Sequence, residues 1–236
     1  MKKALLSVLL TFGGLSAKAA DQIPSEFKGS ISVEVGYRYL LALPEGYEAD
    51  TSKKWPLIVF LHGAGERGSD LENLKKHGPP KLIAAGKKIP AIVASLQCPS
   101  GELWNSRGVK ALTDDLIQKH RVDAGRVYLT GLSMGGFGTW DTAFDYPDTY
   151  AAIVPICGGA GVRWLIADKL KHLPAWIFHG EKDPVVDPAY STMMHKALSK
   201  IGAPVKLTMY PGVGHDSWTA AYDDPALWEW LFQQKR

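Results

Sequence analysis

Short apolar runs alternate with amphipathic segments along most of this chain. Six runs are almost entirely apolar and are bounded by glycine, proline or polar residues: PLIVFLHG, AIVASLQCP, RVYLTGLS, YAAIVPICGG, AWIFHGEKD and VKLTMYPG. Apolar runs of this length predict parallel strands that are covered by helices on both faces. Apolar residues recur every three or four positions at 109–120, 134–146, 187–202 and 223–236, which predicts helices there.

The segment ahead of these runs has a different pattern. In SISVEVGYRYLLALPEGY, apolar and polar residues alternate, which predicts an antiparallel pair of strands at the edge of the sheet. Strand and helix patterns then alternate to the end of the chain. We therefore predict an α/β fold with a mostly parallel, twisted sheet of about eight strands and helices on both faces. At 236 residues and 46% hydrophobic content, the chain can form one large domain.

The first residues have the features of an export signal. Lys2 and Lys3 precede an apolar run that is too short to cross a membrane, and Ala17-Lys18-Ala19 resembles a small-residue cleavage site. We predict a signal peptide at residues 1–19 and a single catalytic domain at residues 20–236, exported to the periplasm or the extracellular space. Cleavage would remove three lysines and no acidic residue, which leaves 24 basic against 24 acidic residues.

A neutral mature chain narrows the range of partners. Without a basic tract, we expect no binding to nucleic acid or to an anionic membrane surface, and no cysteine near the cleavage site offers a lipid anchor. The sequence does not specify an oligomeric state. Cys98 and Cys157 each follow a predicted strand. We expect two free thiols, because the sheet order implied by the resemblance described below places two other strands between them. No cluster of cysteine and histidine has the spacing of a structural zinc site.

Ser133 is the candidate nucleophile. It lies in Gly131-Leu132-Ser133-Met134-Gly135, directly after a predicted strand and before a predicted helix. A serine on such a tight turn projects its Oγ from the carboxyl edge of the sheet, and glycine neighbours allow the backbone to turn. The helix that follows contributes N–H groups and the positive end of its dipole where an oxyanion forms.

A nucleophilic serine needs a base, and three histidines follow predicted strands: His62, His179 and His215. His215 is the best placed because the glycine-rich loop YPGVGHDSW after the last strand can carry an imidazole over the sheet edge. We expect His62 to hold its loop in shape and His179 to be structural.

The base in turn needs a carboxylate to fix its tautomer. Asp183 follows the penultimate predicted strand and is our candidate, whereas Asp187 precedes a helical pattern and is better explained as an N-cap. The resulting chain order of Ser133, Asp183 and His215 is the order associated with a nucleophile elbow.

Two backbone N–H groups are candidates for the oxyanion hole. One belongs to Met134, directly after the nucleophile, and the other to the loop HGAGERG, where we favour Ala64 and keep Gly65 as the alternative. In the same loop, Glu66 and Arg67 are expected to form an internal ion pair and have no catalytic role.

These motifs resemble the α/β-hydrolase superfamily from about Tyr37 to the C-terminus. The runs YRYLLALPEGY, WPLIVFLHGAGERGSD, GLSMGGFGTW, PICGG, HGEKDPVV and GHDSW resemble a branch of small secreted esterases related to feruloyl and acetylxylan esterases, which includes predicted peptidases and phospholipase/carboxylesterase-like proteins. The resemblance implies the same three residues as a catalytic triad, with the oxyanion loop after His62. It also implies that the strands ending at Cys98 and Cys157 flank the two that carry the oxyanion loop and the nucleophile.

The segment 157–174 bounds the substrate, because it has room for one short helix but not for a lid domain. An open cleft favours bulky or polymer-borne esters, and Trp104, Trp218 and Trp164 are predicted in loops at the catalytic edge, the first two as substrate-binding residues. We therefore predict a secreted serine ester hydrolase that needs no metal or organic cofactor. Its expected substrates are feruloyl or acetyl esters of plant cell-wall polysaccharide. Two alternatives remain open: a peptidase or amidase of the prolyl-oligopeptidase kind, and a non-catalytic carbohydrate-binding protein on a hydrolase scaffold.

Overall fold

A computed structural model describes residues 26–236 of the chain, so the predicted signal peptide lies outside the described residues. The chain divides into two units, one ending at Glu34 and the other running from Val35 to Arg236, and the second contains every described helix and strand. None of the helices in this part of the chain is long and apolar enough to cross a membrane.

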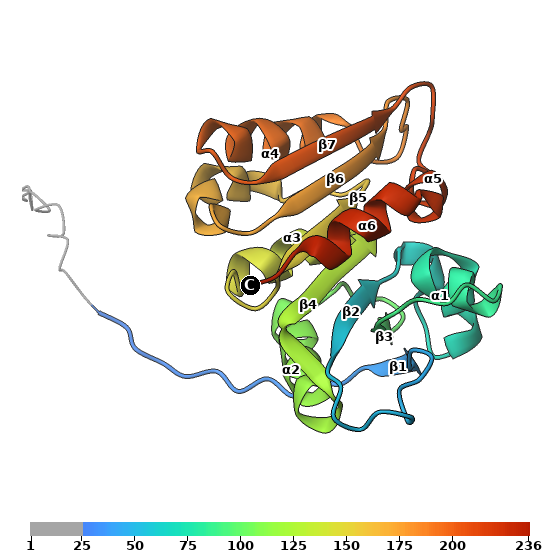
Figure 1. The fold of residues 1–236 in the computed structure, drawn as a ribbon. Helices are drawn as coiled ribbons and strands as arrows, with labels where there is room; N and C mark the ends of the chain where they lie inside the picture. The colour runs from blue at the N-terminus through green and yellow to red at the C-terminus, as the bar shows by residue number, and fades with distance from the viewer. Residues whose placement is uncertain (1–25) are drawn as a thin grey trace, which may run out of the picture. The chain divides into compact units, whose positions relative to one another are not determined.

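Seven strands form one sheet in the order β1-β3-β2-β4-β5-β6-β7 (Figure 1). Only β1 runs antiparallel, against β3, and the remaining pairs are parallel. The strands are β1 (Arg38–Ala42), β2 (Trp55–Leu61), β3 (Ile92–Gln97), β4 (Val122–Leu132), β5 (Ala152–Ile156), β6 (Ala175–Gly180) and β7 (Val205–Tyr210). The predicted α/β-hydrolase class is confirmed, with seven strands in the described chain rather than about eight.

Six α-helices and three 3₁₀ helices connect or follow these strands within residues 26–236. The α-helices are α1 (Gly78–Ala84), α2 (Ser106–Lys119), α3 (Met134–Asp145), α4 (Ala189–Lys200), α5 (Trp218–Asp223) and α6 (Pro225–Gln233). The 3₁₀ helices are η1 (Ala64–Glu66), η2 (Leu71–Lys76) and η3 (Gly161–Leu170). All four predicted helices are present, whereas the short helices between β2 and β3 were not predicted.

Capping residues explain where two of the predicted boundaries differ. Asn105 accepts the N–H groups of Arg107 and Gly108 at 3.0 and 3.2 Å, so α2 begins ahead of the predicted residue 109. Asp224 accepts the Ala226 N–H at 2.9 Å and is followed by a proline, so the C-terminal helix predicted from residue 223 begins at Pro225 as α6, and α5 before it was not predicted.

The apolar runs are continuous because each face of the sheet packs on its own core. Along β2, Leu57, Val59 and Leu61 contribute to the core under α2, α3 and α4, and the intervening Ile58 and Phe60 to the core under α5 and α6. Figure 1 shows α6 lying across the central strands. Because successive side chains of a strand point to opposite faces, a strand covered on both faces needs an apolar residue at every position.

The predicted antiparallel pair at the N-terminal edge is wrong. Only β1 forms, paired with β3, and residues 26–37 contain no strand. An alternating pattern produces a strand only where a neighbouring strand supplies hydrogen-bond partners, and the pattern itself does not identify that partner.

The strand order places two strands between the cysteines, as the family resemblance implied. Cys98 follows β3 and Cys157 follows β5, with β2 and β4 between them. Both residues are buried free thiols, which confirms the prediction. The loops after β2, β4, β6 and β7 all leave the sheet at its carboxyl edge, where functional residues of parallel α/β sheets gather.

Candidate active site

Ser133 occupies a strained turn between β4 and α3. Its backbone has φ 52° and ψ −119°, a conformation that non-glycine residues rarely adopt. The neighbouring glycines have no room for a side chain: a Cβ on Gly131 would lie 2.3 Å from the Gly135 carbonyl oxygen, and one on Gly135 would lie 2.0 Å from that of Leu61. The glycines predicted to permit the turn are therefore required by close backbone contacts.

The three predicted triad residues come together at the carboxyl edge of the sheet. The Nε2 atom of His215 lies 2.9 Å from Ser133 Oγ, and its Nδ1 atom lies 2.7 Å from Asp183 Oδ2. These residues follow β4, β6 and β7, and the His215 side chain is 20% exposed, so its ring is accessible from solvent. The arrangement provides a hydroxyl, an imidazole and a carboxylate in series.

Asp183 is buried and fully engaged. Its Oδ1 accepts the N–H groups of Val185 and Val186 at 2.8 and 3.0 Å, while Oδ2 faces His215. Burial raises the pKa of this carboxyl, but the hydrogen bonds from His215 and from the two backbone N–H groups outweigh it and hold the pKa below its ordinary value. The residue is therefore ionised when the imidazole needs an anionic partner.

His179 contacts the same carboxylate from inside the fold. Its Nε2 lies 3.2 Å from Asp183 Oδ2 and 3.0 Å from the Val186 carbonyl oxygen, and its Nδ1 lies 2.6 Å from Ser191 Oγ. His179 is fully buried, which agrees with the predicted structural role, and its contact with Asp183 was not predicted. Asp187, the other candidate carboxylate, accepts the Ala189 N–H at 2.8 Å at the start of α4, as expected of a capping residue.

His62 holds the loop after β2 in shape, as predicted. Its Nδ1 lies 2.6 Å from the Gly63 carbonyl oxygen, and its Nε2 accepts the Cys98 N–H at 2.9 Å. These partners require a neutral ring that carries its proton on Nδ1. Burial lowers the pKa of His62 to about 4, which keeps the ring neutral at physiological pH.

The two candidate oxyanion donors begin helices beside Ser133. Met134 is the first residue of α3 and Ala64 the first of η1, and both line the same cavity as Ser133. The first N–H groups of a helix have no acceptor within that helix. The Gly63 N–H, by contrast, already donates to Glu66 Oε2 at 3.0 Å.

The expected ion pair between Arg67 and Glu66 does not form among the described residues. The Arg67 guanidinium donates instead to the carbonyl oxygens of Ala64 and Glu102, at 3.1 and 3.3 Å. Glu66 turns back to cap its own loop, because its carboxylate is placed to accept the Gly63 N–H.

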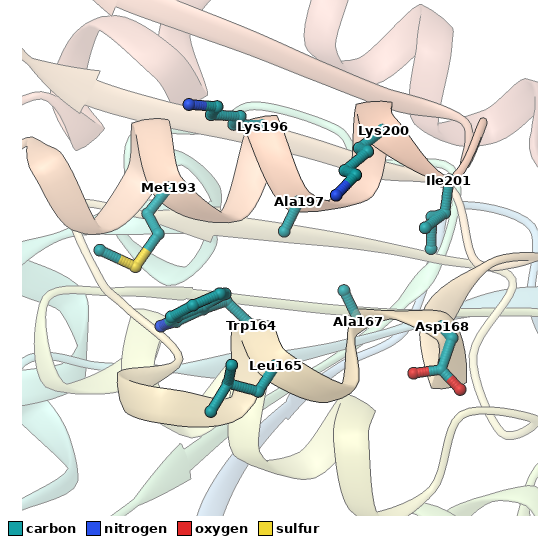
Figure 2. Close-up of a pocket in the computed structure, with 9 residues that line it drawn as sticks. All are labelled: Trp164, Leu165, Ala167, Asp168, Met193, Lys196, Ala197, Lys200 and Ile201. Atoms are coloured by element: carbon teal, nitrogen blue, oxygen red, sulfur yellow. The ribbon is translucent and has the colours of Figure 1, made fainter.

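The cavity at Ser133 has a volume of about 400 Å³ and is open to solvent. Its lining residues are Ala64, Arg67, Leu103, Trp104, Ser133, Met134, Phe137, Gly138 and Asp141. A further, larger cavity of about 530 Å³ lies between η3 and α4, where Trp164 faces Met193 (Figure 2). Trp164 therefore lines this second cavity and not the one at Ser133, which corrects its predicted placement.

Of the two tryptophans predicted to bind substrate, Trp104 lines the cavity at Ser133 and Trp218 does not. Trp104 lines the cavity, but it is only 7% exposed and its Nε1 donates to the His62 carbonyl oxygen at 3.0 Å. Trp218 packs against the catalytic edge itself: its ring centroid lies 5.2 Å from that of His215, with the two planes at 90°. Its indole N–H donates to His77 Nδ1 at 3.2 Å, a partner that the sequence did not indicate.

Within residues 26–236, one group of side chains has metal-ligand spacing, and it overlaps the site. Ligand atoms of Cys157, Asp183 and His215 lie within 4.8 Å of one another. The relevant atoms of Asp183 and His215 already bond to each other, and burial raises the pKa of the Cys157 thiol to about 12, which disfavours a thiolate ligand. The donor set is thus better suited to proton transfer than to metal binding.

The strand order and the turn at Ser133 define the α/β-hydrolase fold. Over residues 89–225 the sequence matches the dienelactone hydrolase family, and the chain belongs to that family. The match covers β3 to α5 and includes Ser133, Asp183 and His215.

Several known proteins resemble parts of this chain. An uncharacterized secreted protein of Arthroderma benhamiae is 27% identical over 205 residues, 70% of this chain and 22% of that protein. Poly(3-hydroxyalkanoate) depolymerase C of Paucimonas lemoignei is 45% identical over 134 residues, 50% of this chain and 30% of that protein. The present chain thus spans under a third of the length of these two relatives.

Solved structures give the same fold. A thermostable esterase has a TM-score of 0.73 and 34% identity, with coverage of 84% of this chain and 59% of that chain. A ferulic acid esterase has a TM-score of 0.62 at 18% identity, with coverage of 82% and 89%, a likeness that shows the fold alone.

Proposed function

We propose that this chain is an exported serine carboxylic-ester hydrolase that works through an acyl-enzyme. One observation carries the proposal: Ser133 Oγ, His215 and Asp183 are joined by contacts of 2.9 and 2.7 Å, with the serine on a strained turn. Proximity of nucleophile, base and orienting carboxylate is the signature of nucleophilic catalysis. Membership of a hydrolase family and the esterases among its structural relatives support the proposal.

In the first half-reaction, Ser133 Oγ attacks the ester carbonyl carbon while its proton moves to His215 Nε2. Asp183 holds the Nδ1–H side of the ring and stabilises the imidazolium that forms. The negative oxygen of the tetrahedral intermediate takes hydrogen bonds from the N–H groups of Met134 and Ala64. The carbon–oxygen bond then breaks, the alcohol leaves with the proton from His215, and the acyl group remains on Ser133.

The second half-reaction repeats these steps with water. His215 takes a proton from water as the oxygen attacks the acyl carbon, and the same two N–H groups hold the oxyanion. Collapse of this intermediate returns the proton to Ser133 Oγ and releases the acid. The two half-reactions therefore need only these side chains and backbone N–H groups, the ester and water.

The open site limits the kinds of ester that the chain is expected to bind. The segment between β5 and β6 contains only η3, so no lid from this position covers Ser133. An exposed cleft of about 400 Å³ suits esters carried on a polymer better than a long free acyl chain. We accordingly propose feruloyl or acetyl esters of plant cell-wall polysaccharide as substrates, with Trp104 in the cleft and Trp218 next to it, against His215.

A second substrate class has one specific observation in its favour. The 45% identity over 134 residues with a poly(3-hydroxyalkanoate) depolymerase favours an aliphatic polyester. An exposed site would serve such a polymer equally well. An exported enzyme can act on a polymer that is too large to enter a cell, and the Arthroderma benhamiae relative is itself described as secreted.

The test is covalent labelling combined with a substrate panel. Residues 20–236 are treated with a fluorophosphonate and peptide-mapped beside Ser133→Ala, with the exposed Ser199→Ala on α4 as the matched control. We expect labelling at Ser133 in the wild type and in the Ser199 variant only. Turnover of methyl ferulate, acetylated xylan, a poly(3-hydroxyalkanoate) film and a peptide anilide then ranks the substrates. Folded protein that is neither labelled nor active would refute the esterase proposal, and faster anilide turnover would indicate an amidase.

A further inference from the structure

Trp218 lies between the proposed catalytic base and a second histidine. Its ring centroid is 5.2 Å from that of His215 and 5.4 Å from that of His77. The indole N–H donates to His77 Nδ1 at 3.2 Å. Because this half-buried ring has its single donor bonded, it is held in one orientation where it contacts His215.

His77 in turn faces the loop that carries the proposed oxyanion donor. Its Nε2 lies 3.7 Å from Glu66 Oε1, and the other carboxylate oxygen, Oε2, accepts the Gly63 N–H at 3.0 Å. The Glu66 side chain is only 9% exposed. One buried carboxylate therefore contacts both the backbone next to Ala64 and the histidine that holds Trp218.

The two contacts of His77 require the same protonation state. An indole N–H can only donate, so His77 Nδ1 must present a lone pair. The ring proton then lies on Nε2, on the side of the Glu66 carboxylate, which favours that tautomer. In this tautomer, the His77 ring accepts from the Trp218 indole N–H on one side and directs its own N–H toward the Glu66 carboxylate on the other.

The three residues belong to separate parts of the fold. Glu66 ends η1, His77 precedes α1, and Trp218 begins α5. The start of α5 is also tied to the base through the backbone, because the Ser217 N–H donates to the His215 carbonyl oxygen at 2.8 Å. A displacement of the Trp218 ring would therefore act directly on the loop that carries His215.

We propose that Glu66, His77 and Trp218 form a positioning relay that connects the oxyanion loop to the His215 ring and sets its place beside Ser133. None of the three takes part in bond making; each acts through the next, and Trp218 acts on His215. The proposal rests on the proposed ester hydrolysis, which supplies its kinetic readout. It further requires that the position of the His215 ring depends on the hydrogen bond between Trp218 and His77.

Two substitutions of His77 separate this role from simple packing. His77→Leu removes the acceptor for the indole, whereas His77→Asn supplies a carbonyl oxygen close to the Nδ1 position. We expect His77→Leu to lower kcat for an aryl ester about ten-fold with little change in KM, since a small misplacement of a catalytic group reduces the rate. Fluorophosphonate labelling of Ser133 should slow in parallel. His77→Asn should restore most of both rates, and the exposed His172→Leu serves as the matched control.

A double-mutant cycle provides the stricter test. Trp218→Phe keeps an aromatic ring next to His215 but has no N–H, so the relay predicts that adding His77→Leu in that background costs no further activity. Additive losses in the double variant would overturn the proposal, as would a His77→Asn enzyme no better than His77→Leu.

An NMR readout keeps the inference testable without turnover. In ¹⁵N-labelled protein, His77→Leu should shift the Trp218 indole N–H resonance and the imidazole resonances of His215, while His172→Leu should leave both in place. If the wild type neither hydrolyses esters nor reacts with fluorophosphonate, the proposed function fails. The resonances still show whether His77 and Trp218 position the His215 ring. Unchanged His215 resonances in a folded His77→Leu protein would overturn it.

Discussion

The Nε2 atom of His215 lies 2.9 Å from Ser133 Oγ, although 82 residues separate the two in the sequence. The contact arises because both residues follow parallel strands, β7 and β4, whose carboxyl ends lie at the same edge of the sheet. The serine lies on a strained turn, and the histidine lies in a glycine-containing loop after β7. We therefore expect the reaction to take place at Ser133 and His215.

Replacing Ser133 should abolish turnover and reveal the strain of the turn. Both Ser133→Ala and Ser133→Gly remove the Oγ, and we expect kcat to fall on the order of a million-fold in each. Glycine adopts the backbone conformation at φ 52° without the Cβ penalty. Ser133→Gly should therefore be about 1 kcal/mol more stable than Ser133→Ala in urea unfolding. A glycine variant less stable than the alanine variant would contradict a strained elbow.

Asp183→Asn should affect both rate and acid stability. We expect kcat to fall about 10⁴-fold, because an amide leaves the imidazole in the wrong tautomer. The lowered pKa of Asp183 means that its carboxylate stabilises the fold above the ordinary carboxyl pKa, and that this contribution is lost as the pH falls through the folded-state value.

The stability half of this prediction is measured by urea unfolding from pH 7 to pH 2.5. The wild type should be more stable than Asp183→Asn at neutral pH, and the difference should shrink below about pH 4. A difference that stays constant across this range would mean that the Asp183 charge does not stabilise the fold.

His62 should make the fold less stable in mild acid. Its pKa is lowered to about 4 by burial, while an unfolded histidine has a pKa near 6.5, so the unfolded state takes up a proton that the folded state does not. This contribution to stability is complete above about pH 6.5 and is lost as the pH falls toward about 4, by up to about 3 kcal/mol.

The measurement compares the free energy of unfolding at several pH values between 7 and 4.5. His62→Gln should have a flatter profile than the wild type, and the exposed His172→Gln should match the wild type. Parallel profiles for the wild type and His62→Gln would show that His62 is protonated in the folded state.

Two glycines beside the site should respond very differently to alanine. A Cβ on Gly135 would lie 2.0 Å from the Leu61 carbonyl oxygen, whereas one on Gly65 would meet nothing within 4 Å. Gly135→Ala should thus fail to fold or lose several kcal/mol, and Gly65→Ala should change stability by less than about 1 kcal/mol. Thermal unfolding decides this, and a stable Gly135→Ala protein would contradict the close approach of β2 and α3.

The cysteines should be unreactive in the folded protein. Both are buried, and burial raises the pKa of Cys98 to about 11 and that of Cys157 to about 12. Because the thiolate is the reactive form, a thiol reagent should label neither residue natively and both after denaturation without reductant. Denatured protein with fewer than two reactive thiols would indicate a disulfide.

The sequence alone determined the fold class, the strand and helix alternation and the three residues at the strand ends. Periodicity reports whether one or both faces of an element are covered, and parallel strands bring their carboxyl ends to one edge wherever the loops lead. For this reason Ser133, Asp183 and His215 could be named without coordinates. The need for glycine on either side of Ser133 could also be predicted, because the turn is formed by residues that are close together in the sequence.

Only the tertiary structure decided which side chains from separate loops touch. It placed Trp164 at the cavity beside α4, joined His179 to Asp183, and linked Glu66 to Trp218 through His77. Such contacts depend on the paths of loops between distant segments, and no local pattern records those paths. The same reason explains the single edge strand β1, since alternation indicates a strand but does not identify the neighbour that completes its hydrogen bonds.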